Sequence, residues 1–172
     1  MLVYLADLAH DYQDIRQYMP LNVGYLAAHA KAVFGERIEI RLFKSADKLL
    51  DAVDERRPGL VGLSNYSWNL ALSAFAGRRI KQAHPELPVI MGGPNIGNDP
   101  QSIGDFLKRN GPCDVYCMYS SELSVSRIIG HLLELPAEER TGETLRGTDF
   151  DGCYSLRGGE LTGNADIGGG KD

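Results

Sequence analysis

Polar side chains interleaved with aromatic rings follow the apolar segment 60–63, and together they could bind a small molecule. The cluster consists of Ser64, Asn65, Tyr66, Ser67, Trp68 and Asn69. Hydroxyls and amides can hydrogen-bond the polar periphery of a ligand while rings cover its apolar surface. Ser67 and Asn69 are also natural N-cap residues, and Trp68 could equally be a core residue. The two interpretations are compatible, so the cluster predicts a binding site without excluding a local structural role.

A second chemical signal is the glycine pair at the end of the apolar segment 89–91. Gly92 and Gly93 are followed by Pro94 and Asn95. Without Cβ atoms, two successive glycines let the backbone approach a bulky flat ligand closely. A plain tight turn before a proline explains the same residues equally well.

Asp7 and His10 form a third candidate, in the loop after the first apolar segment. A carboxylate three residues before a histidine could orient it as a metal ligand. An exposed loop histidine is the better interpretation, because no second histidine or cysteine lies nearby in the sequence. The sequence therefore does not identify a metal ligand.

The cysteines and the standard catalytic motifs indicate little chemistry of their own. Cys113 and Cys117, with Ser120 in the third position, fall one residue short of the signature that holds the iron–sulfur cluster in radical S-adenosylmethionine (SAM) enzymes. We interpret this match as accidental, because serine is a poor cluster ligand and Cys117 lies in a predicted strand. The sequence has no Walker A motif, no Gly-x-Gly-x-x-Gly and no Gly-x-Ser-x-Gly elbow, so neither phosphate cradling nor a serine triad is indicated.

Composition narrows the class of partner. The 172 residues have a net charge of −5, with no basic block, which argues against nucleic acid and anionic membrane surfaces. No apolar run is long enough to span a bilayer, and the N-terminus lacks the features of a signal peptide. Three irregularly spaced cysteines do not make a disulfide framework. We expect a cytoplasmic protein whose partner is a small, partly apolar ligand or another protein.

Five apolar segments alternate with helical patterns and would position these residues. The predicted strands are residues 2–6, 38–43, 60–63, 89–91 and 114–118. Such alternation predicts a doubly wound α/β fold, with a five-stranded parallel sheet between two layers of helices. In this class, ligands bind outside the carboxyl ends of the strands, where the polar clusters fall. In the first helix, which opens at Pro20, the spacing places Leu21, Tyr25, Ala28 and Ala32 on one face.

The composition changes after residue 135. We therefore predict an α/β domain over residues 1–135 and a connecting segment over residues 136–172. Within that segment, residues 152–162 read as a small β-hairpin, and the glycine-rich residues 163–172 read as a linker.

Several segments, in this order, resemble a known family. The segments are 20–29, 58–69, 80–85 and 89–94, followed by 114–122 and an amphipathic helix. The series is similar to the N-terminal cobalamin (B12)-binding domain of B12-dependent radical SAM enzymes, over about residues 1–135. Three features depart from the family: the Asp-x-His-x-x-Gly motif that supplies a cobalt ligand in methionine-synthase-like domains is missing, Ser120, Ser121 and Glu122 replace the usual Gly-Glu turn, and no radical SAM domain is present in this sequence.

The resemblance implies a flavodoxin-like sheet that holds a corrinoid across the strand ends and is not catalytic alone. A radical SAM domain of the same parent chain, with its 4Fe-4S cluster and S-adenosylmethionine, would carry out methyl transfer or radical chemistry. The implied cofactor-binding residues are Asp7, His10, Ser64, Asn65, Tyr66, Ser67, Trp68, Asn69, Gly92, Gly93, Pro94, Asn95, Tyr119, Ser120, Ser121 and Glu122. The nucleotide tail of the cofactor would need a slot beside the sheet, bordered by Ser64, Gly92 and Gly93.

Two other hypotheses remain. A degenerate domain could keep the fold and serve as a scaffold or interaction module without a cofactor, and the altered Gly-Glu turn favours it slightly. A receiver-like or flavin-binding domain fits less well. Receivers need an aspartate at the end of the third strand, where this sequence has Ser64, and the loop after the first strand lacks the serine, threonine and glycine of a flavodoxin phosphate loop.

Overall fold

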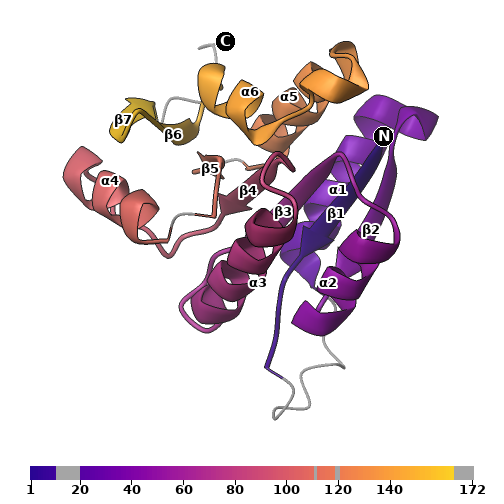
Figure 1. The fold of residues 1–172 in the computed structure, drawn as a ribbon, viewed down its shortest axis with the longest axis horizontal. Helices are drawn as coiled ribbons and strands as arrows, with labels where there is room; N and C mark the ends of the chain where they lie inside the picture. Colours follow the sequence, from indigo (N-terminus) through magenta and orange to yellow (C-terminus); the bar gives the residue numbers. More distant parts are fainter. Residues whose placement is uncertain (11–19, 111, 119–120, 165–172) are drawn as a thin grey trace.

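The computed structural model describes residues 1–10, 20–110, 112–118 and 121–164 (Figure 1). Strands and helices alternate as the sequence pattern predicts, up to the fifth helix. The elements, in chain order, are β1 (Leu2–Ala6), α1 (Leu21–Phe34), the 3-10 helix η2 (Gly35–Arg37), β2 (Glu39–Phe43), α2 (Ala46–Glu55), β3 (Leu60–Ser64), α3 (Leu70–Ala83), β4 (Val89–Gly92), α4 (Pro100–Arg109), β5 (Val115–Cys117), α5 (Ser121–Glu134), the 3-10 helix η3 (Ala137–Glu139), α6 (Gly142–Gly147), β6 (Cys153–Arg157) and β7 (Glu160–Gly163).

One sheet of seven strands runs through the molecule, in the order β2-β1-β3-β4-β5-β6-β7. Neighbours among β1 to β5 pair in parallel, so the predicted parallel, doubly wound arrangement of these strands is confirmed. The predicted sheet of only five strands is wrong, because β6 and β7, in the segment that the sequence analysis read as a separate hairpin, continue it: β6 pairs antiparallel with β5, and β7 pairs antiparallel with β6. The added strands cover the backbone edge that β5 would otherwise expose.

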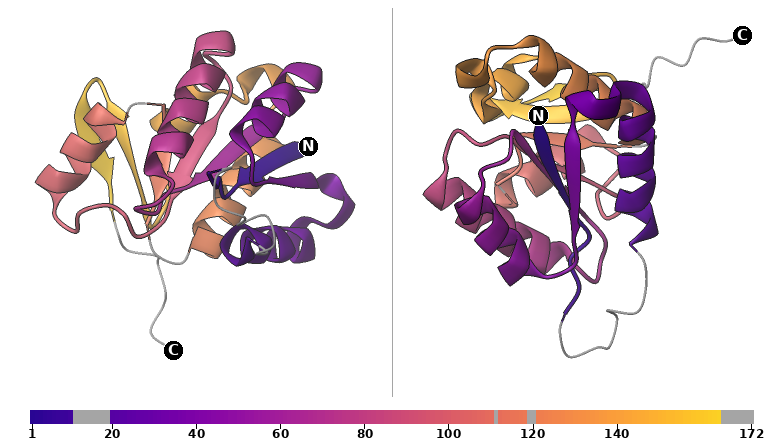
Figure 2. Two further views of the ribbon diagram at one scale, coloured as in Figure 1. Left: turned by 90° about the horizontal axis from the view of Figure 1, so that it is seen from below. Right: turned by 90° about the vertical axis from the view of Figure 1, so that its right-hand side faces the viewer.

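Helices cover both faces of the sheet, and each face has its own apolar core (Figure 2). The first core packs α2, α3 and α4 against one face, with Tyr4, Met91 and Tyr116 pointing into it from the strands. The second packs α1, α5 and Leu145 of α6 against the other face, with Leu5 and Ile90 among its strand residues. Because strand side chains alternate between the two faces, residues two apart in a strand share a core.

The face of α1 that the sequence indicated is not the buried one. Leu21 and Tyr25 are 60% and 64% exposed, and Ala28 and Ala32 are exposed with them. The residues that α1 buries include Val23 and Ala30. Apolar residues occur on more than one side of this helix, so spacing alone did not fix which side meets the sheet.

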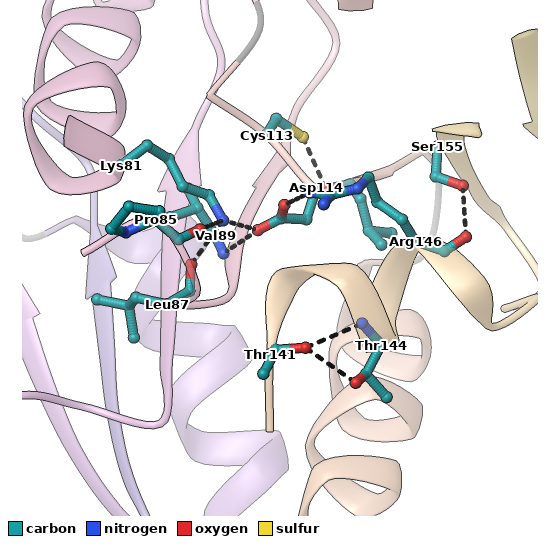
Figure 3. A network of polar contacts seen from close by, with 11 residues as sticks. Lys81, Pro85, Leu87, Val89, Cys113, Asp114, Thr141, Thr144, Arg146 and Ser155 are labelled. Carbon is teal, nitrogen blue, oxygen red and sulfur yellow. Dashed lines mark hydrogen bonds and ion pairs between the residues drawn. The ribbon is translucent and has the colours of Figure 1, made fainter. Parts of the chain in front are cut away.

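The segment after α5 is built into the same sheet and core as the strands before it. The sequence did not predict α6, which begins at a Thr141 cap that accepts a hydrogen bond from the Thr144 amide. Arg146 of this helix reaches the carboxylate of Asp114, which precedes β5 (Figure 3). Lys81 of α3 contacts the same carboxylate, with 2.5 Å between Nζ and Oδ2, and the Val89 amide donates to it over 2.8 Å. This network, called here the Asp114 cluster, joins three parts of the chain at the N-terminal ends of β4 and β5.

Candidate functional site

A cavity of about 470 Å³ lies where the sequence analysis placed the site, at the C-terminal ends of the parallel strands. Its floor is the sheet face that packs on α1 and α5, and those two helices form its walls. The strands contribute Leu5 of β1, Gly62, Leu63 and Ser64 of β3, Ile90, Met91 and Gly92 of β4, and Cys117 of β5. The helices contribute Asn22, Val23, Tyr25 and Leu26 of α1 and Ser121, Glu122 and Val125 of α5. The loops between these elements contribute Tyr66, Gly93, Pro94, Ile96, Asn98 and Met118. The volume lies in the range of small-molecule sites, about 300–1,000 Å³.

Two glycines lie on the face of the sheet beneath this cavity. Alternation along β3 directs Gly62 to the same face as Leu60, which packs in the core beneath α1 and α5. In β4, Gly92 likewise follows Ile90 on that face. The glycines give close-packed neighbours room: a Cβ at Gly62 would lie 2.7 Å from Leu5, and a Cβ at Gly92 would lie 3.1 Å from the Cys117 carbonyl oxygen.

Gly93 is required by the backbone itself. Its φ of 138° is one that residues with a side chain rarely adopt, and a Cβ atom there would lie 2.3 Å from the carbonyl oxygen of Asn65. Gly92 is less constrained, since its Cβ would lie 3.1 Å from the carbonyl oxygen of Cys117. Gly93 therefore has a structural explanation, and Gly92 lines the cavity close to Cys117 and Ser121.

Three predicted site residues hydrogen-bond one another beside the cavity. Ser64 Oγ donates to Asp7 Oδ1 over 2.7 Å, and Asn69 Nδ2 donates to the same carboxylate oxygen over 2.9 Å. Asn69 Oδ1 in turn accepts from the Tyr66 amide over 2.8 Å. Asn69 is fully buried, so its amide holds the β3–α3 turn against the end of β1 instead of facing a ligand.

A second network fastens the β4–α4 loop. The buried Asn65 donates from Nδ2 to the Tyr116 hydroxyl over 2.8 Å and to the Asn95 carbonyl over 2.9 Å. The Tyr116 hydroxyl donates onward to the Gly93 carbonyl over 2.7 Å. Burial raises the pKa of Tyr116, so its hydroxyl stays protonated and continues to donate. Asn65 and Asn95 thus position the glycine turn beside the cavity.

The two aromatic residues of the first cluster stack on each other. The ring centroids of Tyr66 and Trp68 are 4.5 Å apart, with the planes 11° from parallel. Tyr66 lines the cavity, whereas Trp68 is 63% exposed and lies outside the lining, so the core interpretation of Trp68 is wrong. Ser67 is also exposed.

The start of α5 provides the wall opposite β3. Ser121 and Glu122 both line the cavity, and the Ser121 hydroxyl donates to the Met118 carbonyl over 3.1 Å. Tyr119 and Ser120, also predicted here, lie outside the described residues. His10 is half-buried after β1 and is not part of the lining.

Of the predicted residues that the structure describes, seven line the cavity and four others belong to the supporting networks. The lining contains Ser64, Tyr66, Gly92, Gly93, Pro94, Ser121 and Glu122. The supporting networks contain Asp7, Asn65, Asn69 and Asn95. The sequence analysis missed the α1 wall and the floor. Gly62 could have been found, because it lies two residues before Ser64 and hence on the same face of β3.

Within residues 1–10, 20–110, 112–118 and 121–164, no group of three or more His, Cys, Asp or Glu side chains is placed to hold a metal ion. Over the same residues, no helix is both long and apolar enough to cross a membrane.

By sequence, the chain is similar to two methyltransferases, one of which is named cobalamin-dependent. It is 31% identical over 104 residues to a 2-(S-pantetheinyl)-carbapenam-3-carboxylate methyltransferase of Streptantibioticus cattleyicolor, a match that covers 57% of this chain and 14% of the relative. It is 23% identical over 118 residues to the cobalamin-dependent radical SAM methyltransferase TokK of Streptomyces tokunonensis, covering 65% of this chain and 17% of TokK. The chain thus spans less than a fifth of the length of either relative. No family model matches it.

Among solved structures, a cobalamin-binding protein from Desulfitobacterium hafniense has a similar fold, with a TM-score of 0.57 and 18% identity over 76% of this chain and 58% of that protein. A CheY-like protein, TadZ, from Pseudomonas aeruginosa matches with a TM-score of 0.53 and 22% identity over 79% of this chain and 97% of TadZ. These likenesses establish a flavodoxin-like fold, shared by cobalamin-binding and receiver proteins. At these identities they do not distinguish the two functions.

Proposed function

We propose that this chain is a cobalamin-binding domain that holds the corrinoid at the C-terminal ends of its strands. We further propose that it belongs to a radical SAM methyltransferase-type enzyme and is not catalytic alone. The observation that carries the proposal is the cavity of about 470 Å³ between the sheet and the helices α1 and α5, with Gly62 and Gly92 in its lining. The sequence similarity to two methyltransferases, one of them named cobalamin-dependent, supports the same function.

The cavity fits one part of the cofactor in particular. About 470 Å³ is too little for a whole corrinoid, but it suits the planar base and adjoining nucleotide of the tail. Leu5, Leu26 and Val125 would cover the faces of the base, which would lie between the sheet and the two helices. The macrocycle would then rest on the rim outside the strand ends, near Pro94 and Glu122.

The chemistry in this proposal belongs to the cofactor, and the chain supplies its position. Bound cobalamin would carry a methyl group or assist radical chemistry in a second domain of the parent chain. The buried amide and hydroxyl networks around Asn65 and Asn69 hold the β3–α3 and β4–α4 loops in place before any ligand arrives. A preformed site of this kind loses little conformational entropy on binding.

Two competing functions receive less support. A scaffold domain without cofactor would be expected to fill the space between the sheet and the helices α1 and α5 with its own side chains, but a cavity of about 470 Å³ remains there. A receiver needs a phosphorylatable aspartate at the end of β3, and the residue there is Ser64, which is bonded to Asp7 and Asn69.

Titration with hydroxocobalamin tests the proposal directly. We expect a change in the corrin absorbance and co-elution of cobalamin with the protein at micromolar concentrations. A cobinamide, which keeps the macrocycle but lacks the nucleotide tail, is the matched control and should bind at least about tenfold more weakly. If neither corrinoid binds, the scaffold hypothesis replaces ours. If both bind equally, the cavity does not hold the tail.

The parent enzyme requires a separate test. The full-length reading frame should encode a Cys-x-x-x-Cys-x-x-Cys signature beyond Asp172. Its absence from the parent protein would contradict the radical SAM assignment and leave the cobalamin proposal intact.

A further inference from the structure

Two buried cysteines face each other on the wall of the cavity. Cys117 of β5 and Cys153 of β6 are directly opposite in the antiparallel register, and their Sγ atoms are 3.8 Å apart. They are 1% and 3% exposed, and Cys117 is one of the residues that line the cavity. Both thiols are reduced in this structure.

The local strand geometry brings this pair unusually close. The Met118 amide donates to the Gly152 carbonyl over 2.8 Å, which flanks the cysteines with a ladder bond and makes them a non-hydrogen-bonded pair. In such pairs the Cα atoms are about 4.5 Å apart, within the range of about 4.4–6.8 Å that a disulfide spans. Side-chain rotation is therefore enough to bring the two sulfur atoms into bonding distance.

We propose that Cys117 and Cys153 are a redox-active pair, which a low-molecular-weight disulfide such as oxidised glutathione converts to a disulfide between β5 and β6. Cys153 attacks first: its thiolate attacks one reagent sulfur, the reagent S–S bond breaks, and one reagent thiolate leaves. The Cys117 thiolate then attacks the Cys153 sulfur and expels the second reagent thiolate. The pair loses two electrons and two protons, and the reagent departs as two thiols.

The environment of Cys153 suits the first step. Its hydrogen bond with the Cys117 thiol lowers the pKa of Cys153, and the Ser124 hydroxyl and the positive charge of Arg127 act in the same direction. The same hydrogen bond and burial raise the pKa of Cys117, so Cys153 is the member of the pair that reaches the attacking thiolate form first. The third cysteine, Cys113, is arranged differently: its thiol donates to the Val115 carbonyl over 2.8 Å.

The consequence is a covalent link between the cavity wall and the last two strands. Only the pairing with β5 joins β6 and β7 to the parallel strands within the sheet. The disulfide would therefore fix this end of the sheet and slow amide hydrogen exchange in β6. The reaction requires no cobalamin, so its outcome is independent of the proposed function.

Oxidation in glutathione buffers tests the pair, with free-thiol titration and peptide mapping as readouts. In the wild-type chain, free thiols should fall from three to one, with a Cys117–Cys153 peptide link that dithiothreitol reverses. Cys113→Ser is the matched control and should form the same link, whereas Cys117→Ser and Cys153→Ala should form none. Slower exchange in β6 of the oxidised chain would report the cross-link in the folded protein. The proposal fails if folded protein gives only mixed disulfides with glutathione, or if Cys113 is one partner of the link.

Discussion

The two ends of the parallel strands differ in how tightly their side chains pack. At the N-terminal end, the Asp114 cluster packs a carboxylate that is only 1% exposed against Lys81 and Arg146 (Figure 3). At the C-terminal end, a cavity of about 470 Å³ lies between the sheet and the helices α1 and α5. The same strands are therefore fastened at one end and left open for a ligand at the other.

The chemistry of the polar groups differs between the ends as well. Burial raises the pKa of Asp114, while the charge of Lys81 and the bond from Val89 oppose that rise. At the cavity end, most of the supporting contacts are amides and hydroxyls, with the Asp7 carboxylate as the acceptor for Ser64 and Asn69. Losing one partner of a buried ion pair is costly, whereas exchanging a neutral hydrogen bond costs less. We therefore expect the N-terminal end to dominate stability and the C-terminal end to dominate binding.

Lys81→Met should have the largest effect on folding. It leaves the buried Asp114 carboxylate without the more buried of its two cations and should lower the free energy of unfolding by about 3 kcal/mol. Urea denaturation measures this loss, and cobalamin affinity should be unchanged. Lys108→Met, at an exposed lysine of α4, is the control and should cost less than about 0.5 kcal/mol. An equal loss in both variants would contradict the fastening role of the cluster.

The pH dependence of Lys81→Met sharpens the same prediction. Without the lysine, the pKa of folded Asp114 rises further above its unfolded value of about 3.9. A raised folded pKa means that stability falls as the pH rises from the unfolded value toward the folded one. The deficit relative to the wild-type chain should therefore be largest near neutral pH and shrink as the pH falls toward 4. A deficit that does not change with pH would mean that the carboxylate is not the group left unpaired.

Gly93→Ala should have the next largest effect, again on folding. Its Cβ would meet the Asn65 carbonyl at 2.3 Å, at a φ of 138°. Backbone must shift, and we expect a loss of about 2 kcal/mol in unfolding free energy without any ligand present. Gly24→Ala in α1, where nothing lies within 4 Å of the added atom, should be neutral or stabilising. If Gly93→Ala keeps the wild-type free energy of unfolding and loses only its affinity for cobalamin, both glycines are needed for ligand binding and the structural explanation of Gly93 is wrong.

Leu26→Trp should separate binding from stability. The larger ring would extend from the α1 wall into the cavity and should weaken cobalamin binding at least tenfold, about 1.4 kcal/mol. Leu161→Trp is a matched control, because that half-buried leucine of β7 packs against the core on the opposite face. Absorbance titration of both variants gives the comparison. Unchanged affinity in Leu26→Trp would remove the cavity from the proposed site.

Much of the fold could be predicted because the strands and helix caps depend on patterns of neighbouring residues. The apolar runs fixed all five parallel strands, and Ser45 caps α2 as its residue type suggests, accepting from the Lys48 amide. The pairing of β6 with β5 could not be predicted, because it joins residues 36 apart through a backbone edge that leaves no pattern in the sequence. The Asp114 cluster was missed for the same reason, since its charges come from α3, α6 and the turn before β5.

The part of the site that lies at the strand ends could be predicted from the sequence. Residues at strand ends, such as Ser64 and Gly92, were found because strand ends of a parallel sheet meet at one edge. The wall formed by α1 was not, because choosing its buried face requires knowing where the sheet lies. The sequence also could not distinguish residues that line the cavity from residues that support its loops. Asn69 and Ser64 are both polar, but only Ser64 lines the cavity.

Substitution of Trp68 should have the smallest effect on stability, and its fluorescence reports directly on binding at the C-terminal ends of the strands. It is the only tryptophan in the chain, it is 63% exposed, and it stacks on Tyr66, which lines the cavity. Trp68→Phe should change the free energy of unfolding by less than about 0.5 kcal/mol, because one side of the ring faces water. Binding of the strongly absorbing corrinoid beside Tyr66 should quench the Trp68 fluorescence of the wild-type chain. The quenching should saturate at the same concentration as the absorbance titration, and Trp68→Phe should bind cobalamin without that signal. Binding that leaves the fluorescence unchanged would place the macrocycle away from the β3–α3 turn and restrict the site to the β4 and β5 side of the cavity.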